Sequence, residues 1–246
     1  MSQLTEKVAL VTGGSRGIGA AIAKRLAADG ASVAFTYAKN ASAASAVVKA
    51  IELAGGKAVA IQADAANVEA VRGAVEKAVA TFGRLDVLVN SAGTAIPKPF
   101  QETTLEEMDR VIDINLRGVL ATTQAALKHM NDGGRIIMIG SAVGERAVAP
   151  GLVPYAATKG AVKMFTQALS REVGSRGITV NNVQPGPIDT DLNPASGDWA
   201  VPQKAATALN RYGHVDEVAA LVAFVAGPES SYVTGANLTV DGGMNA

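Results

Sequence analysis

The chain has 246 residues, 48% of them hydrophobic, and its 22 basic side chains balance its 22 acidic ones. This length is ordinary for a single α/β domain with one large core. The balanced charge, without any long run of one sign, excludes nucleic acid and acidic membrane surfaces as expected partners.

Residues suited to metal binding are scarce. The chain has no cysteine, which excludes disulfides, thiol nucleophiles and thiolate metal sites. Its two histidines, His129 and His214, are far apart and lack ligand-like spacing, so we expect no metal. No signal peptide is visible, and no apolar run approaches the ~20 residues of a membrane span. We therefore expect a cytoplasmic protein.

Short apolar runs alternate with longer, alanine-rich helical patterns along the whole chain. The expected strands are 7–12, 31–37, 57–63, 85–90, 134–140, 178–184 and 236–240. Strands of nearly continuous Val, Ile and Leu, separated by helices, indicate a parallel sheet covered on both faces. We predict one domain over 1–246, an α/β Rossmann-type doubly wound parallel sheet of about seven strands with helices on both faces.

A glycine-rich turn joins the first expected strand to the first helix. It comprises Thr12 followed by Gly13, Gly14, Ser15, Arg16, Gly17, Ile18 and Gly19. Glycines at 13, 17 and 19 let the backbone turn tightly and approach a pyrophosphate, which the first amides of the helix can bind. A tight turn with only a structural role is the alternative.

The end of the second expected strand bears on which dinucleotide is bound. A carboxylate there would grip the adenosine ribose and repel a 2′-phosphate. The segment 35–40 contains Tyr37 and Lys39 but no acid, and Arg16 and Ser15 offer further donors. We predict NADP(H) rather than NAD(H); the alternative is that Arg16 and Lys39 are solvated surface charges.

Tyr155 and Lys159 are four residues apart on an expected helix, and Ser141 ends the fifth expected strand. Positions i and i+4 share a helix face, so the ammonium can lie beside the phenol. A cation ~4 Å away would favour phenolate by about 4 kcal/mol, or roughly three pKa units at most. We therefore expect Tyr155 to exchange a proton near neutral pH. Taken alone, the Tyr–Lys pair could simply be the start of an amphipathic helix.

The segment from Pro185 to about Tyr212 lacks a clear period and holds four prolines and the only tryptophan. Loops of this length inside a domain are usually lids, binding loops or disordered. We expect a substrate lid at about 187–212, with an irregular connection as the alternative.

Taken together, these motifs resemble the short-chain dehydrogenase/reductase family over residues 6–246. The shared motifs are the cradle 12–19, Asn90-Ser91-Ala92-Gly93, Ser141, Tyr155 with Lys159, and Pro185-Gly186. The chain is most similar to the branch that includes the 3-oxoacyl-[acyl-carrier-protein] reductases. The resemblance implies an NADP-dependent oxidoreductase and a homotetramer.

The resemblance also implies roles for individual residues. Tyr155 would be the general acid, Ser141 would polarise the substrate carbonyl, and Lys159 would bind the nicotinamide ribose and lower the Tyr155 pKa. Asn115 matches the asparagine that holds a water in a proton relay. The remaining cofactor contacts implied are Asp64 near the adenine, Asn90, Ala92 and Gly93 in the cleft, and Pro185, Gly186, Ile188 and Thr190 beside the carboxamide. Two alternatives stay open, namely that Asn115 has no role and that Asp64 only forms a turn.

The expected reaction is NADPH-dependent reduction of a ketone, either a 3-oxoacyl thioester or a small carbonyl compound. The alternatives are an alcohol or sugar dehydrogenase working in the oxidative direction, and a non-enzymatic NADP-binding redox sensor. Family members that act on carrier-protein substrates carry clustered basic residues where this chain has 128–134, with Lys128 offset by Asp132. An apolar pocket is suggested by Trp199, Val201, Pro202, Val143, Ala147, Val148 and Leu152.

Overall fold

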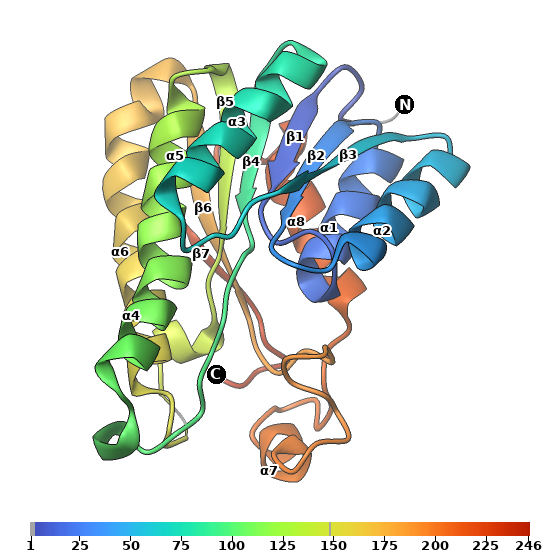
Figure 1. Ribbon diagram of the computed structural model, residues 1–246. Helices are drawn as coiled ribbons and strands as arrows, with labels where there is room; N and C mark the ends of the chain where they lie inside the picture. The colour runs from blue at the N-terminus through green and yellow to red at the C-terminus, as the bar shows by residue number, and fades with distance from the viewer. Residues whose placement is uncertain (1–2, 148) are drawn as a thin grey trace.

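The computed structural model describes residues 3–147 and 149–246. These residues form one seven-stranded parallel sheet in the order β3-β2-β1-β4-β5-β6-β7 (Figure 1). The strands are β1 Val8–Val11, β2 Ser32–Tyr37, β3 Lys57–Gln62, β4 Leu85–Asn90, β5 Met130–Ile139, β6 Thr179–Pro185 and β7 Asn237–Val240. The predicted α/β fold with a doubly wound parallel sheet is therefore confirmed.

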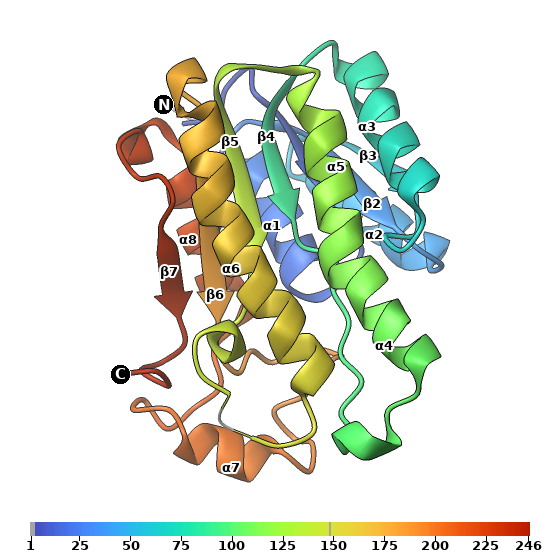
Figure 2. The same ribbon diagram turned by 90° about the vertical axis from the view of Figure 1, so that its left-hand side faces the viewer.

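Helices cover both faces of the sheet (Figures 1 and 2). One hydrophobic core joins the sheet to α1 (Gly17–Ala28), α2 (Ala41–Leu53) and α8 (Val215–Ala226). The other joins it to α3 (Val68–Phe82), α5 (Gly118–Leu127) and α6 (Val153–Val173). Two shorter helices are α4 (Leu105–Ile112) and α7 (Ala200–Ala205), and 3₁₀ turns occupy Phe100–Glu102, Ala142–Gly144, Gly174–Arg176 and Pro228–Ser230.

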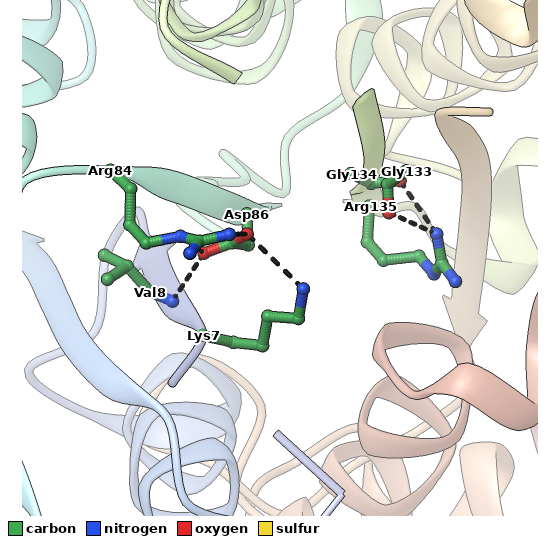
Figure 3. Close-up of polar contacts among 7 residues, drawn as sticks. All are labelled: Lys7, Val8, Arg84, Asp86, Gly133, Gly134 and Arg135. Atoms are coloured by element: carbon green, nitrogen blue, oxygen red, sulfur yellow. Dashed lines mark hydrogen bonds and ion pairs between the residues drawn. The ribbon is translucent and has the colours of Figure 1, made fainter. Parts of the chain in front are cut away.

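The predicted strand limits agree with the structure within about one residue except at β5. This strand begins at Met130 rather than 134, and its register against β4 shifts between Leu85 and Val87. Gly133 has a left-handed φ of 77°, and the Arg135 guanidinium donates to the carbonyl oxygens of Gly133 at 2.7 Å and Gly134 at 3.1 Å (Figure 3). The irregular segment pairs with β4 through backbone geometry, which a pattern of apolar residues does not reveal.

Asp86 organises the amino ends of β1 and β4 (Figure 3). Its buried carboxylate accepts the backbone N–H of Val8 at 3.0 Å and two hydrogen bonds from Arg84 at 2.6 and 2.8 Å. The Lys7 ammonium lies 3.6 Å away. Asp86 therefore has a structural role at the edge of the sheet opposite the motifs that carry chemistry.

Those motifs gather at the carboxyl edge of the sheet. β1 lies between β2 and β4 in the sheet. The chain therefore continues from β1 through β2 and β3 on one side, and then crosses to β4 on the other side. Parallel α/β sheets bind ligands in the crevice at such a switch point. The turns after β1, β4, β5 and β6 all open at this edge, and α7 lies beyond it (Figure 2).

Candidate active site

The glycine turn after β1 forms a closely packed cradle. The N–H of Gly13 donates to Thr36 Oγ1 at 3.0 Å, and the N–H of Gly14 donates to the Thr36 carbonyl at 2.8 Å. Gly13 has a left-handed φ of 69°, and a Cβ added at Gly19 would lie 2.3 Å from the Gly13 carbonyl oxygen. Only glycine fits at these two positions.

Helix α1 starts inside this cradle. Arg16 stands at its N-cap, and no side chain caps the helix there. The half-buried Ser15 and Ile18 flank this start, and Gly17 faces Thr190. Uncapped amides at the positive end of a helix suit a phosphate. The cradle thus fits the pyrophosphate of a dinucleotide.

The segment after β4 is fastened to the cradle through Thr12. Its hydroxyl accepts the N–H groups of Ser91 at 2.9 Å and Ala92 at 3.0 Å. Ala92 packs against Gly13, where an added Cβ would come within 2.9 Å of the Ala92 Cα. The Asn90 amide points into the protein and donates to Thr123 Oγ1 at 3.0 Å. The predicted residues of this segment therefore line the crevice mainly with their backbone atoms.

Asn115 lies in a π-helical turn, Asp113–Arg117, between α4 and α5. Single π turns inside helices often occur at functional sites. The fully buried Asn115 side chain donates to the Thr94 carbonyl at 2.9 Å and to Thr158 Oγ1 at 3.2 Å, and accepts the Thr94 N–H at 2.9 Å. These bonds join α6 to the segment after β4, so Asn115 has a structural role, and its part in a proton relay stays a prediction.

The structure brings together three of the residues expected to carry the chemistry. A Cβ added at Gly93 would lie 3.6 Å from Asn115 Oδ1 and 3.8 Å from the Lys159 ammonium. Lys159 Nζ is 5.6 Å from the centre of the Tyr155 ring and donates to the Ile139 carbonyl at 2.6 Å. Tyr155 and Lys159 therefore share one face of α6, directed at the carboxyl ends of β4 and β5.

The expected effect of Lys159 on Tyr155 is wrong for this arrangement of side chains. Burial raises the pKa of the Tyr155 phenol, and a hydrogen bond with Ser141 opposes the rise. Burial also lowers the pKa of Lys159 from 10.5 to about 8. Loss of solvation acts on both groups and disfavours both charged forms. The Coulomb attraction assumed from the i, i+4 spacing does not overcome it.

Ser141 stands at the end of β5, where its Oγ accepts the Val143 N–H at 3.2 Å. Only 8% of its surface is exposed. Beyond it, a Cβ added at Gly144 would lie 3.0 Å from the Lys159 carbonyl, so the turn after Ser141 packs directly on α6. This packing places the serine hydroxyl beside the tyrosine phenol.

The side chains predicted for the 2′-phosphate are solvent-accessible. Tyr37 is half-buried at the end of β2 and Lys39 is exposed beyond it. Arg16 Nη1 lies 3.8 Å from Asp191 Oδ2, and both side chains are largely exposed. Arg16 therefore pairs with the segment predicted as a lid, a partner that the sequence did not indicate.

Asp64 forms a turn after β3, since its Oδ1 accepts the Ala66 N–H at 3.0 Å. Its carboxylate also pairs with the Arg110 guanidinium of α4 at 3.2 Å. Asp64 thus forms a turn and also pairs with Arg110, and its contact with adenine stays a prediction.

The stretch after β6 meets both the tail of the chain and the cradle. Pro185 ends β6 opposite Val240, and a Cβ added at Gly186 would lie 2.7 Å from the Asp241 Cα. Ile188 is buried, and the Thr190 methyl carbon lies 3.5 Å from the Cβ position of Gly17. Thr190 and the cradle therefore face each other across the crevice.

Residues 187–212 contain the short helix α7, which the aperiodic sequence did not predict. Asn193 and Gln203 exchange two hydrogen bonds at 2.8 and 3.1 Å. Arg211 holds Glu217 of α8 at 2.7 and 2.9 Å, which lowers the pKa of Glu217 to about 2. The segment is thus ordered within itself and anchored at its carboxyl end.

Four of the seven residues suggested for an apolar pocket are exposed to solvent. Trp199 and Val201 are 56% and 77% exposed, and Pro202 and Ala147 are exposed too. Val143 and Leu152 are half-buried. Val148 lies outside the described residues.

Two threonines have roles that the sequence did not reveal, although Thr12 had been placed in the cradle. Thr12 links the cradle to the segment after β4, and Thr158 accepts from Asn115 and donates to the Tyr155 carbonyl at 2.7 Å. Each stands next to a motif residue, Gly13 or Lys159, and this adjacency was the available signal. Among residues 3–147 and 149–246, no three His, Cys, Asp or Glu side chains cluster as metal ligands. Within the same ranges, no helix has the length and apolar character to cross a bilayer.

A doubly wound sheet with a glycine cradle and a Ser–Tyr–Lys cluster defines a dinucleotide-dependent oxidoreductase. A family model described as Enoyl-(Acyl carrier protein) reductase matches residues 13–245. A solved short-chain dehydrogenase/reductase from Serratia marcescens is 51% identical, covers 99% of this chain and 100% of that one, and has a TM-score of 0.98. A short-chain dehydrogenase from Burkholderia cenocepacia, solved in complex with NADP, is 52% identical with the same coverage and TM-score. A 3-oxoacyl-[acyl-carrier-protein] reductase from Synechocystis sp. is 44% identical over 99% of each chain.

The chain therefore belongs to the short-chain dehydrogenase/reductase family, and it is an oxidoreductase. The predicted family is confirmed. The NADP in the Burkholderia structure agrees with the predicted NADP(H) cofactor.

Proposed function

We propose that this oxidoreductase reduces a ketone to a secondary alcohol with NADPH, acting on a small carbonyl compound or a 3-oxoacyl thioester. One observation carries the proposal: Tyr155, hydrogen-bonded by Ser141, shares a face of α6 with Lys159, beside Gly93 and Asn115. A phenol and a hydroxyl directed at one oxygen suit the protonation of an alkoxide.

NADPH supplies a hydride, with its electron pair, to the carbonyl carbon. The C=O π electrons pass to oxygen, where Ser141 donates a hydrogen bond to the growing negative charge. Tyr155 gives its proton to that oxygen, which completes the alcohol. Because burial raises the pKa of Tyr155, the phenol is in its acid form at neutral pH, as this direction requires. Lys159 then gives a proton to the phenolate, and solvent reprotonates Lys159 through a water that Asn115 would hold.

The cradle residues would hold the cofactor. We propose that α1 binds the pyrophosphate and that Arg16, Ser15 and Lys39 meet the 2′-phosphate. Arg16→Ala should raise the Michaelis constant for NADPH at least tenfold and leave that for NADH nearly unchanged, because a charge-assisted bond to phosphate is lost. Equal catalytic efficiency of the wild type with the two cofactors would contradict the proposal.

Within this function, we favour a small free ketone over a carrier-bound substrate. The 128–134 segment lies near Arg176, whose Nε donates to Asp132 Oδ1 at 2.9 Å. Asp132, which was expected to offset Lys128, therefore neutralises Arg176 instead. So few basic side chains would steer an acidic carrier protein only weakly, because charge complementarity guides such docking. We also propose that residues 187–212 close over the substrate.

Two other functions compete with ketone reduction. An alcohol or sugar dehydrogenase working oxidatively would favour NAD and a carboxylate near Tyr37, which the sequence lacks. A redox sensor would bind NADPH without turnover. Retention of Asn115, Ser141, Tyr155 and Lys159 supports an enzyme.

The homo-oligomer implied by the family finds support in exposed apolar side chains. Leu105 of α4, Leu120 of α5 and Met164 of α6 are 73%, 40% and 59% exposed. Phe224 of α8, on the opposite face of the sheet, and Tyr232, before β7, are exposed as well. We propose a homotetramer, which light scattering coupled to size-exclusion chromatography would test.

The deciding experiment follows NADPH consumption with small ketones, diketones and acetoacetyl thioesters. Tyr155→Phe should lose nearly all turnover and keep NADPH binding, since the cradle is remote from the phenol. Retention of a tenth of the activity would exclude Tyr155 as the acid. Absence of turnover with every ketone, together with tight NADPH binding, would favour the sensor.

A further inference from the structure

The tail that follows β7 reaches the turn after Ser141. The Asn245 side-chain amide donates to the Ala142 carbonyl at 2.9 Å, although the two residues are 103 positions apart. A carbonyl can only accept, so this bond fixes which end of the amide faces the turn. Ala142 directly follows Ser141, so this bond holds the residue next to the reactive hydroxyl.

The tail itself is held in a defined conformation. The two carboxylate oxygens of Asp241 accept the backbone N–H groups of Gly243 at 3.0 Å and Asn245 at 3.1 Å. Further along, the carbonyl of Gly242 accepts the N–H of Leu209 at 3.1 Å. The tail is thus anchored to its own start and to residues 187–212 before it meets the turn.

Other contacts also hold the Ser141 turn, which packs on α6 at Gly144. The Ala142 carbonyl also accepts the N–H groups of Glu145 at 3.0 Å and Arg146 at 3.1 Å, which close the turn. On its other side, the Glu145 carboxylate pairs with Lys163 of α6 and accepts from Gln184 at 3.0 Å. On the other side of Ser141, the N–H of Gly140 donates to the Val183 carbonyl at 2.7 Å. Asn245 is the tail residue that holds the turn at Ala142.

We propose that Asn245 is a positioning residue, which aims the Ser141 hydroxyl at the Tyr155 phenol by holding the Ala142 carbonyl. This inference rests on the proposed reduction for its kinetic consequence, but its structural part does not. Asn245→Asp is the sharpest test because it preserves size, removes the N–H donor and directs a carboxylate at a carbonyl oxygen. Asn131→Asp, at an exposed position of β5, is the matched control.

Hydrogen–deuterium exchange tests the structural part without any turnover. In Asn245→Asp, the amides of Gly144, Glu145 and Arg146 should exchange at least tenfold faster, because their acceptors in the turn are loosened. The control should exchange like the wild type. Unchanged protection in Asn245→Asp would overturn the proposal whether or not the protein reduces ketones.

Kinetics test whether the residue acts through Ser141. A misplacement of about 1 Å can cost up to about 100-fold in rate, so we expect kcat to fall about tenfold in Asn245→Asp with an unchanged Michaelis constant for NADPH. Added to Ser141→Ala, the same substitution should cost less than twofold in single-turnover rate, since the hydroxyl it positions is gone. A tenfold cost in that background would overturn the proposal.

The pH profile gives a second signature. The hydrogen bond of Ser141 lowers the pKa of Tyr155. If that bond is weakened, the alkaline limb of kcat, where the phenol loses its proton, should move to higher pH in both Asn245→Asp and Ser141→Ala. If the tail only stabilises the fold, Asn245→Asp should lower the amount of active enzyme and leave the alkaline limb at its wild-type pH. That result would overturn the proposal. A wild type without turnover on any ketone would instead refute the proposed function.

Discussion

Replacement of Lys159 by Met separates the chemistry of this site from its cost in stability. Burial lowers the pKa of Lys159 from 10.5 to about 8, which corresponds to about 3 kcal/mol of unfavourable free energy for carrying the charge in the folded protein. The side chain is only 6% exposed, so solvent screens little of this cost. The charge is maintained for function at the expense of stability.

The sign of the pH dependence follows from the two pKa values. Below pH 8 the lysine is charged in both states, and the cost is fully present. Between pH 8 and about 10.5 the unfolded chain binds a proton that the folded protein does not, so stability rises by about 1.4 kcal/mol per pH unit. Above that range the lysine is neutral in both states, and the cost is gone.

Lys159→Met removes this cost and also the hydrogen bond to Ile139, worth about 1 kcal/mol. At pH 7 the variant should therefore be more stable than the wild type by about 2 kcal/mol, and at pH 9.5 the two should be nearly equal. Turnover should be lost at every pH.

Urea denaturation at pH 7, 8, 9 and 9.5 measures the difference in unfolding free energy between the two proteins. Lys49→Met, at an exposed position of α2, is the control, and its curve should run parallel to that of the wild type. A difference between Lys159→Met and the wild type that stays constant from pH 7 to 9.5 would refute the reasoning.

Three further predictions concern the cradle and the sheet. Gly19→Ala should weaken NADPH binding at least tenfold in a fluorescence titration, because its Cβ would lie 2.3 Å from a cradle carbonyl; Gly73→Ala of α3, where an added Cβ meets open space, should bind normally. Asp86→Asn should lower the unfolding free energy by about 2 kcal/mol in urea with kcat unchanged, because charged hydrogen bonds at the sheet edge are lost. Asp191→Asn should leave the unfolding free energy unchanged, because exposed ion pairs contribute below about 1 kcal/mol. It should lower the Michaelis constant for NADPH a few-fold, because Arg16 loses its competing partner. An equal effect with NADH would contradict that last mechanism.

Much of the fold could be predicted from local patterns. Short runs of Val, Ile and Leu between helical patterns favour parallel strands, so six of the seven strands were located within about one residue, the edge strands β3 and β7 among them. The glycine turn could be predicted equally well, because left-handed φ angles and a close approach of the backbone leave little choice of residue. The spacing of Tyr155 and Lys159, with Ser141 upstream, indicated the chemistry because residues four apart share a helix face.

The partners of charged side chains could not be predicted in the same way. No pattern in the sequence indicated that Asp64 pairs with Arg110, or that Arg16 lies beside Asp191. Both pairs join segments far apart in the chain, and many exposed charges could serve equally well. The contact between Asn245 and the turn after Ser141 belongs to the same class.

The pKa of Tyr155 separates what the sequence determined from what only the tertiary structure decided. Sequence by itself determined that a phenol and an ammonium share one face of a helix, because helical periodicity is a local property. Only the tertiary structure decided that loss of water outweighs their attraction, since burial is set by β4, β5 and the turn after Ser141 packing over α6. Solvation depends on every neighbour in space, and spacing along the chain does not encode it.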